Sequence, residues 1–257
     1  MISLPLPPKI THKKSNHAVF EIEGLYPGYG VTIGNSLRRV LLSSLEGVAV
    51  TELSMKGVAH EFSTIPGVLE DAVMVSLNAK NLRFKIFEGD SYALELSKKG
   101  EGKVTGADFK LPAQVELANP DLHLATITDK GTDFKMEIKI EKGIGYVPAE
   151  QQKGKKSAIG TIMLDAIFTP IKNVNFHVDN MRVGDRTDFN KLSLEIETDG
   201  TISPEAAFFK ACEILINHYN VIFEGNVKMP KQDNSVSRDK EKDKKEVKRK
   251  KTIKKKK

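Results

Sequence analysis

The sequence holds very little cysteine, one residue among 257, and no tryptophan. A single cysteine excludes a disulfide framework and any zinc or iron–sulfur site built from several cysteines. Residues 1–8 lack the basic start and apolar run of a secretory signal. No apolar stretch approaches the roughly 18 residues that a membrane-spanning helix requires. These absences predict a soluble cytoplasmic protein, long enough for one large domain or two smaller ones.

Positive charge is also scarce over most of the chain, although the net charge is +6. Residues 228–257 contain 15 Lys or Arg and 5 Asp or Glu, whereas residues 1–227 contain 25 basic and 29 acidic residues and carry a net charge of −4. A segment this charged and this poor in apolar residues cannot bury enough surface to offset its conformational entropy. We therefore expect a folded body over 1–227 and a disordered Lys-rich tail over 228–257.

The pattern of apolar residues predicts an α+β fold in which helices pack on antiparallel strands. The clearest alternation of apolar and charged residues, at 134–141, is typical of a strand in an antiparallel sheet with one solvated face. A polar loop is expected over 143–157. Other strands are expected over 17–23, 48–56, 171–183 and 191–198, with several short ones between 82 and 141. Helices are expected over 34–47, 68–79 and 203–220.

The helix expected over 34–47 has one apolar face and a basic outer face. Asn35 or Ser36 is expected to cap its start, and Gly47 to end it. Arg38-Arg39 and Leu42 form either a solvated basic pair beside a surface leucine or a docking surface for a partner, because Arg39 and Leu42 point away from the apolar face. The residues that share the apolar face are Leu37, Val40, Leu41, Ser44 and Leu45.

The helix expected from Ser203 onward is apolar around most of its circumference. Ser203 is expected to cap it, with Pro204 at the first helical position. A helix this apolar must be covered on more than one side. Its own sheet is expected to cover one side and a partner helix, possibly from a second copy of the chain, the other. The polar strip is formed by Lys210, Glu213, Asn217 and Asn220.

The catalytic motifs that we searched for do not have the spacing that their chemistry requires. Residues 28–34 are one residue too long for a dinucleotide-binding loop, so a turn that needs glycine backbone freedom is expected there. His60-Glu61 lacks the second histidine of a zinc site. Cys212 lies among apolar residues and is expected to be a small core residue.

The residue types of a catalytic triad occur at His177, Asp179 and Ser193, but nothing in the sequence brings them together. We therefore expect this chain to hold no catalytic residue, no metal site and no cofactor.

Several segments together resemble the bacterial RNA polymerase alpha subunit. Residues 34–44, Gly-Asn-Ser-Leu-Arg-Arg-Val-Leu-Leu-Ser-Ser, look like the first helix of that family. Collinear matches across about 17–223 make the resemblance more specific than any single motif. The further matches are Ala49–Glu52, His60–Thr64, Gly67–Asp71, Leu77-Asn78, Gly145–Ala149, Val183, Arg186–Asp188, Leu192 and Glu197–Ile202.

The resemblance implies a dimerisation domain built from both ends of the chain, residues 1–47 and 170–227, and an inserted mostly-β domain over 48–169. It also implies a homodimer on which the beta and beta-prime subunits assemble, with omega and sigma in the holoenzyme. The chain would then belong to a nucleotidyltransferase without supplying catalytic residues. The dimer contacts implied are Leu37, Leu41, Leu45, Phe208, Cys212, Leu215 and Tyr219.

The resemblance further implies two sets of residues that bind the large subunits. On the first helix and a following segment, the resemblance implies contacts with beta at Arg38, Arg39, Leu42, Ser43, His60, Glu61, Ser63 and Thr64. On a later strand region, it implies contacts with beta-prime at Arg182, Arg186, Asp188 and Lys191.

The tail departs from the family. Most bacterial alpha subunits continue into a compact helical C-terminal domain that reads upstream promoter DNA, and residues 228–257 are too poor in apolar side chains to be expected to form it. The archaeal counterpart often carries cysteine-rich motifs, so one cysteine argues against that branch. The tail is either a solvated extension or a segment that contacts DNA phosphates through Lys248, Arg249, Lys250, Lys251, Lys254, Lys255, Lys256 and Lys257.

Two other functions stay open. One is a free-standing nucleic-acid-binding protein that uses the basic tail, which would predict a basic stripe on the folded body. The net charge of −4 over residues 1–227 argues against it. The other is an enzyme whose site the sequence does not identify. Co-purification with two very large subunits would separate both from an assembly subunit.

Overall fold

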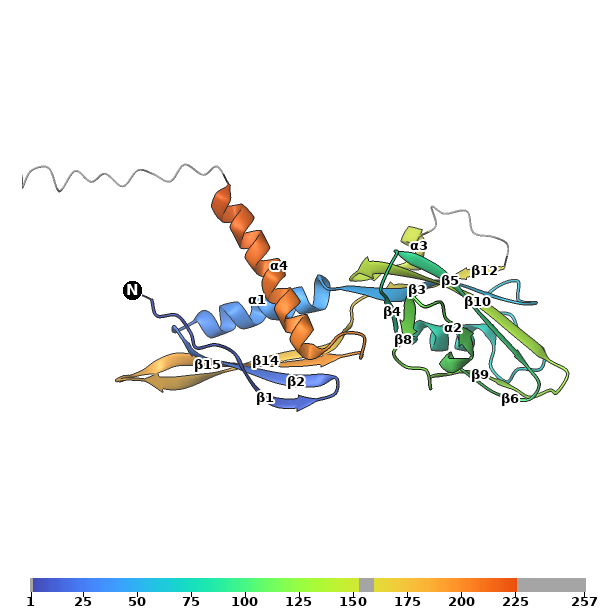
Figure 1. Ribbon diagram of the computed structural model, residues 1–257, viewed down its shortest axis with the longest axis horizontal. Coiled ribbons are helices and arrows are strands. Elements are labelled where there is room, and N and C mark those ends of the chain that lie inside the picture. The colour runs from blue at the N-terminus through green and yellow to red at the C-terminus, as the bar shows by residue number, and fades with distance from the viewer. Residues whose placement is uncertain (1, 153–159, 226–257) are drawn as a thin grey trace, which may run out of the picture. The chain divides into compact units, whose positions relative to one another are not determined.

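The computed structural model describes residues 2–152 and 160–225 (Figure 1). One compact unit ends at Asn217, and a second unit begins at His218. Among the described residues, no helix is both long and apolar enough to span a bilayer. In chain order the elements are β1 (Lys9–Lys14), β2 (His17–Leu25), α1 (Tyr29–Ser43), β3 (Glu46–Met55), α2 (Ala72–Lys80), β4 (Phe84–Ile86), β5 (Ser91–Lys99), β6 (Gly102–Thr105), a 3-10 turn (Gly106–Asp108), β7 (Phe109–Lys110), β8 (Val115–Leu117), β9 (His123–Ile127), β10 (Asp133–Ile144), β11 (Tyr146–Val147), α3 (Ala149–Gln152), β12 (Thr161–Met163), β13 (Ala166–Ile167), β14 (Ile171–Val183), β15 (Arg186–Thr198) and α4 (Pro204–Glu224).

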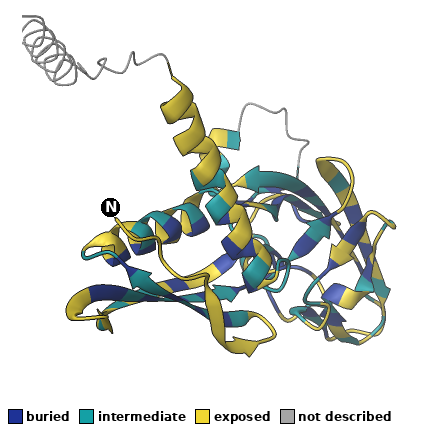
Figure 2. Cartoon of the chain, turned by 60° about the vertical axis from the view of Figure 1, so that its left-hand side comes forward, coloured by how far each residue is buried: buried dark blue, intermediate teal, exposed yellow. Residues whose placement is uncertain are grey.

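A four-stranded antiparallel sheet brings distant parts of the sequence together. Its order is β1-β2-β15-β14, so two strands from the start of the chain pair with two that precede α4. Phe20 lies opposite Leu194, and Val174 lies opposite Ile196. α1 lies on one face of this sheet (Figure 1). Buried residues of both elements belong to one hydrophobic core, and Figure 2 colours the buried residues of the chain dark blue.

The start of α1 depends on glycine. Gly28 adopts the left-handed conformation at the N-cap, with φ +85°, and Tyr29 is the first helical residue. Asn190 Oδ1 accepts hydrogen bonds from the N–H groups of Gly28 (2.8 Å) and Gly30 (3.3 Å). The side chain of Asn190 on β15 therefore satisfies donors that a helix start otherwise leaves unpaired.

The predicted bounds of this helix were wrong at both ends. Asn35 and Ser36 lie inside α1 and do not cap it, and the helix ends at Ser43 rather than at Gly47, which lies in β3. The physical reason is close packing on the sheet. A Cβ atom on Gly34 would lie 2.7 Å from Cδ2 of Phe176, so this glycine permits close approach of a helix rather than marking a turn.

A five-stranded antiparallel sheet, in the order β12-β3-β10-β5-β7, organises residues 46–163. The predicted alternation in β10 is confirmed, because Phe134, Met136, Ile138 and Ile140 are all buried. α2 packs against the buried side of this sheet, where it contacts β3 and β9. Short two-stranded ladders, β4-β8, β6-β9 and β11-β13, complete this part of the chain.

Two predictions in this region need correction. α2 begins at Ala72, not at residue 68, with the side chain of Asp71 accepting a hydrogen bond from the N–H of Met74 (2.8 Å). The preceding residues cannot be helical because Val68 forms a β-bridge with Ile127. The loop expected over 143–157 instead contains the end of β10, β11 and α3, while residues 153–159 lie outside the described residues.

α4 begins as predicted. Ser203 Oγ accepts a hydrogen bond from the N–H of Ala206 (3.2 Å), and Pro204 is the first helical residue. The ring of Phe208 stacks on that of Phe20, with centroids 4.6 Å apart. The compact unit contains one core between the four-stranded sheet, α1 and the start of α4, and another within residues 50–164. The division into a dimerisation domain and an insert domain stays a prediction.

Candidate surfaces for protein assembly

The outer face of α1 presents the first group of predicted contact residues. Arg38, Arg39, Leu42 and Ser43 are all exposed. Ser43 Oγ donates to the carbonyl oxygen of Arg39 (2.7 Å) within the helix. Because the opposite side of α1 is anchored in the core, these side chains stand on a rigid support. Their role in binding stays a prediction.

The loop between β3 and α2 presents the second group. His60, Glu61 and Thr64 are exposed, and Ser63 is half-buried with its Oγ atom 3.2 Å from Nδ1 of His60. The N–H of Ala72 donates to the carbonyl oxygen of Ser63 (3.1 Å), which ties the loop to the start of α2. The structure therefore holds these four residues close together on one exposed loop.

Sequence reasoning missed the residue that anchors this loop. Glu70 is only 8% exposed, and its carboxylate accepts hydrogen bonds from the N–H of Thr126 (2.6 Å), Oγ1 of Thr126 (3.1 Å) and Nε2 of His123 (2.9 Å). Burial raises the pKa of Glu70, but the hydrogen bonds from His123 and Thr126 outweigh it, so the pKa lies below its usual value. One glutamate in a loop gives no local sequence signal for this role, and only the segment Gly67–Asp71 of the family resemblance pointed toward it.

A second missed cluster lies between the two groups. Tyr146 hydrogen-bonds through its hydroxyl to Asp165. Asp165 also accepts from the N–H of Ala149 (3.0 Å) and from Nζ of Lys80 (3.1 Å). The hydrogen bond from Ala149, followed by that from Lys80, lowers the pKa of Asp165. Asp165 lies 16 to 85 residues from its partners in sequence, so no local pattern could reveal the cluster. Only Gly145–Ala149, a segment of the family resemblance, pointed toward it.

The predicted beta-prime residues cluster at the turn between β14 and β15 and along β15. Arg186 forms two hydrogen bonds with Asp188 (Nε–Oδ1 3.0 Å, Nη2–Oδ2 2.7 Å). Its guanidinium also lies over the rings of Tyr26 (5.5 Å) and Phe189 (5.3 Å), an arrangement that favours a fixed arginine. Arg186 is thus held in place before any partner binds.

The other two predicted beta-prime residues lie on the same two strands. Arg182 Nε donates to the carbonyl oxygen of Gly184 (2.8 Å) and is exposed. Lys191 pairs with Glu21 across the sheet (2.9 Å) and is half-buried. Contact of this set with a partner stays a prediction.

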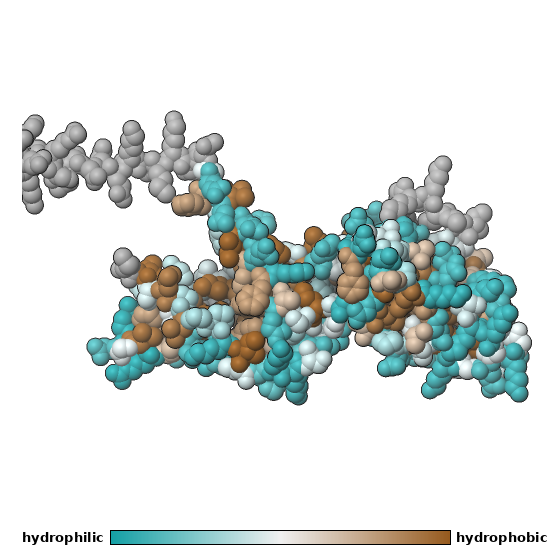
Figure 3. All heavy atoms as spheres, in the orientation of Figure 1, coloured by the Kyte–Doolittle hydropathy of each residue, from teal (hydrophilic) through white to brown (hydrophobic). Residues whose placement is uncertain are grey.

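The predicted dimer residues occupy two different environments. Leu37, Leu41, Leu45 and Phe208 are buried in the chain's own core, so their side chains are not exposed to a partner. Cys212 and Leu215 are half-buried against that core, whereas Tyr219, in the second unit, is 59% exposed. Exposed apolar side chains on α4 outside the predicted dimer set include Phe209 (65%) and Ile216 (57%). Figure 3 colours hydrophobic residues brown, and such residues are visible along α4.

The thiol of Cys212 is poorly suited to nucleophilic chemistry. Burial raises its pKa, which keeps the thiol protonated at neutral pH. This environment agrees with the prediction that Cys212 packs as a small apolar residue.

The three triad residue types lie near one another on β14 and β15, although no sequence pattern indicated this. His177 lies opposite Ser193 in the β14–β15 register, and its Nε2 atom lies 2.9 Å from Oδ1 of Asp179. The side chains of His177 and Asp179 are 76% and 56% exposed. Within the described residues, no hydrogen bond joins His177 to Ser193. An open pair on a solvated sheet face lacks the desolvated environment that nucleophilic catalysis uses.

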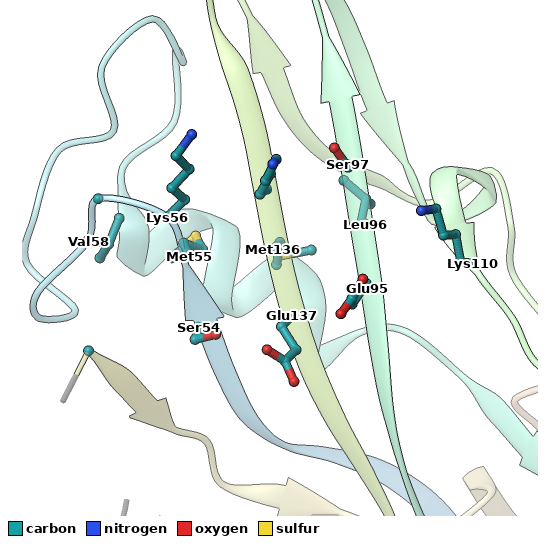
Figure 4. Close-up of a pocket in the computed structure, with 13 residues that line it drawn as sticks. Ser54, Met55, Lys56, Val58, Glu95, Leu96, Ser97, Lys110, Met136 and Glu137 are labelled. Atoms are coloured by element: carbon teal, nitrogen blue, oxygen red, sulfur yellow. The ribbon is translucent and has the colours of Figure 1, made fainter. Parts of the chain in front are cut away.

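A hollow of about 690 Å³ lies on the outer face of the five-stranded sheet (Figure 4). Ser54, Lys56, Glu95, Lys110 and Glu137 are among the residues that line it. Glu137 lies opposite Ser54 and Glu95, and Glu95 lies opposite Lys110, so polar and charged side chains of both signs cover this face. Such a face is typical of a solvated sheet surface rather than a catalytic cleft.

The predicted DNA-phosphate contacts at Lys248–Lys251 and Lys254–Lys257 lie outside the described residues. So does the predicted disordered tail over 228–257.

Comparisons with known proteins agree with one another. A family model described as RNA polymerase Rpb3/RpoA insert domain matches residues 48–169. The chain is 47% identical over 213 residues to the DNA-directed RNA polymerase subunit alpha of Carboxydothermus hydrogenoformans, covering 82% of this chain and 68% of that protein. It is 48% identical over 203 residues to the protein of that name from Flavobacterium psychrophilum (78% and 61% covered). For the one from Oceanobacillus iheyensis, identity is 44% over 224 residues (86% and 71% covered). The matched segment therefore spans 61% to 71% of the length of these relatives.

Proposed function

Since the chain belongs to the family of DNA-directed RNA polymerase alpha subunits, we propose that it is a non-catalytic subunit that forms a homodimer and carries the beta and beta-prime subunits. It works in the cytoplasm at the nucleoid, in a holoenzyme that also contains omega and sigma. The observation that carries this proposal is the outer face of α1. Arg39 and Leu42 are exposed there on a helix whose other side is fixed in the core.

Self-association is proposed through α4. Phe209 and Ile216 are 65% and 57% exposed, and large exposed apolar groups on one helix favour burial against a second copy. The half-buried Cys212 and Leu215 lie beside them and connect this surface with the core beneath. An isologous contact of this kind is the commonest interface of homodimers.

The two large subunits are proposed to bind separate surfaces. Beta binds the outer face of α1 and the loop that holds His60, Glu61, Ser63 and Thr64. Beta-prime binds around Arg182, Arg186, Asp188 and Lys191 on β14 and β15. Arg186 suits such a contact because Asp188, Tyr26 and Phe189 already restrict its side chain, and a preorganised side chain loses less entropy on binding.

The test is capture of purified beta by the purified full chain. Arg39→Ala should weaken binding by about 2 kcal/mol or more, the usual effect of truncating an interface arginine, while the melting temperature stays unchanged. Lys110→Ala, a basic residue on the outer face of the five-stranded sheet, is the control and should bind beta as the parent does. Equal binding by all three proteins would contradict the proposal.

A free-standing nucleic-acid-binding protein is the alternative, motivated only by the basic tail. Co-purification of the chain with two very large subunits favours the assembly role. Purification as a DNA-bound homodimer without them favours the alternative.

A further inference from the structure

A pocket of about 250 Å³ is lined by residues of β3, β4, β10 and α4 and by the residues that precede β14 and α4. Phe84 and Ile86 of β4 contribute buried apolar side chains to its wall. Phe87, the next residue along the chain, also lines the pocket and is 67% exposed. Buried apolar side chains beside an exposed aromatic ring are typical of a surface that receives a side chain of another protein.

Three lysines from different elements line the same pocket (the lysine pocket): Lys85 on β4, Lys142 on β10 and Lys210 on α4. Glu46 is the one acidic residue among the described residues that line it. Lys85 lies 3.8 Å from Glu116, whereas within the described part of the chain neither of the other two lysines forms an ion pair. The folded body carries a net charge of −4, so a gathering of unpaired lysines departs from its general charge and favours an anionic partner.

An ion pair joins the two sides of the lysine pocket. Nε of Arg83, directly before β4, lies 3.4 Å from Oδ2 of Asp199, whose side chain is only 5% exposed. Asp199 Oδ1 accepts hydrogen bonds from the N–H (2.9 Å) and Oγ1 (2.6 Å) of Thr201, and the N–H of Asp199 donates to the carbonyl oxygen of Pro170 (3.0 Å). Thr201 and Pro170 both line the pocket. The pocket is therefore formed before a partner arrives, which lowers the entropy lost on binding.

The lysine pocket suits a protein segment better than a small molecule or a nucleic acid. Its volume of about 250 Å³ lies below the roughly 300–1,000 Å³ of small-molecule sites. Binding of nucleic acid through phosphates requires cations repeated along a surface, whereas Glu46 lines this pocket and Glu116 lies beside Lys85. A segment that carries carboxylates next to a large apolar side chain matches both the lysines and the apolar wall.

We propose that the lysine pocket docks an acidic segment of a second protein, with a large apolar side chain against Phe87 and carboxylates at Lys142 and Lys210. This partner is distinct from the subunits of the proposed function. Beta is proposed to bind α1 and the loop before α2, and beta-prime to bind β14 and β15. Self-association is proposed through Phe209 and Ile216, which lie outside the polar strip of α4 that carries Lys210.

Fluorescence polarisation with the purified full chain tests the inference. The probe is a labelled peptide of the sequence Ser-Asp-Glu-Phe-Asp-Leu-Glu-Ser. One control peptide replaces its acidic residues by Asn and Gln, and another replaces Phe and Leu by Ser. The acidic apolar probe should bind at least about tenfold more tightly than either control peptide, and added salt should raise its Kd because exposed charges are screened. Equal binding of the three peptides, or no binding of the probe, would overturn the inference.

Substitutions in the chain locate the site. Lys142→Gln combined with Lys210→Gln should raise the Kd of the probe about tenfold or more, and Phe87→Ser alone should have a similar effect. The matched controls are Lys14→Gln and Phe62→Ser, whose parent side chains are exposed and do not line the pocket. Both controls should stay within about twofold of the parent. If they weaken binding as much as the pocket variants do, the probe recognises the surface in general and the inference is wrong.

Other ligands give different results with the same lysine variant. Binding of a random DNA duplex, capture of beta and self-association should all be unchanged by Lys142→Gln combined with Lys210→Gln. A tenfold loss of DNA binding while the probe still binds would identify a phosphate site and overturn the inference. Loss of beta capture or of self-association while the probe still binds would place the pocket in the assembly surface, and the inference would be wrong. The proposed function is tested separately by Arg39→Ala.

A measurement on the unmutated chain guards against variants that fail to fold. Amide hydrogen exchange over residues 84–87 and 199–203 should slow at least about fivefold when the probe saturates the chain, because a bound segment suppresses local opening. Residues 174–180 in β14 serve as the internal reference. Unchanged exchange in both segments while the probe is bound would show that it binds elsewhere and would overturn the inference.

Discussion

Nε2 of His123 lies 2.9 Å from Oε1 of Glu70, and this pair ties the loop between β3 and α2 to strand β9. Backbone hydrogen bonds accompany it, from the N–H of Leu69 to the carbonyl oxygen of Thr126 (2.9 Å) and from the N–H of Thr128 to that of Gly67 (2.9 Å). The loop that carries the predicted beta contacts is thereby joined to the core of residues 50–164. A binding loop held this way needs little ordering when a partner arrives.

Glu70→Gln should lower the free energy of unfolding by about 1–3 kcal/mol at pH 7, because a buried charged acceptor with three hydrogen bonds is lost. Urea denaturation followed by circular dichroism measures the change. The control is Glu116→Gln, which removes an exposed carboxylate 3.8 Å from Lys85 and should have almost no effect. A Glu70→Gln protein as stable as the parent would show that the buried carboxylate does not stabilise the loop.

The contribution of Glu70 should also depend on pH. Its pKa is lower in the folded chain than its ordinary value of 4.5, because the hydrogen bonds from His123 and Thr126 outweigh the effect of burial. A lowered folded-state pKa gives stability that is complete above the unfolded pKa and is lost as the pH falls through the folded value. The stability difference between the parent and Glu70→Gln should therefore shrink as the pH falls below 4.5. A difference that grows in acid would contradict this sign.

The corrected start of α1 predicts that substitutions at two neighbouring residues differ in their effect on stability. Gly34→Ala should destabilise the protein by about 1–3 kcal/mol, because the added Cβ atom would lie 2.7 Å from Phe176 and 2.9 Å from Leu192. Asn35→Ala should change stability by less than about 0.5 kcal/mol, since Asn35 is exposed inside the helix. Thermal or urea unfolding distinguishes them. A decrease of about 1 kcal/mol in the free energy of unfolding for Asn35→Ala would instead indicate a helix cap at that residue.

The sequence predicted best where local periodicity decides the structure. Alternation alone placed β10, because Phe134 to Ile140 face a core on every second residue. The sequence pattern misplaced the start of α1, where Gly30 and Gly34 resemble turn residues but allow close packing on β14 and β15. Among the candidate site residues, the exposure of Arg39 and Leu42 was predictable, because both lie opposite the apolar stripe of their helix. Clusters such as Tyr146 with Asp165 depend on contacts between distant segments, which no local pattern specifies.

Substitution of an exposed apolar residue on α4 should weaken self-association without unfolding the chain. Ile216→Glu should convert dimers to monomers while the melting temperature of the monomer is kept, because Ile216 is 57% exposed and a charge buried in an interface is costly. Leu215→Glu should also reduce stability, since Leu215 packs against the core. Asn217→Glu, on the polar strip beside them, is the control. Light scattering at micromolar concentration measures the oligomeric state. Monomers of the unmutated chain would contradict the proposed dimer.

The basic tail gives a prediction from charge alone. Its last ten residues include eight cations, whereas acidic residues interrupt the cluster upstream at 239–246. Each phosphate neutralised should contribute about −0.9 to the log–log slope of DNA affinity against salt. The full chain should therefore show a steeper slope than a chain ending at Val227, on random and AT-rich duplexes alike. Equal slopes for the two proteins would exclude the tail from DNA binding. A strong preference of the full chain for AT-rich duplexes would mean that the tail reads DNA shape as well as charge, since phosphate contacts alone carry no sequence information.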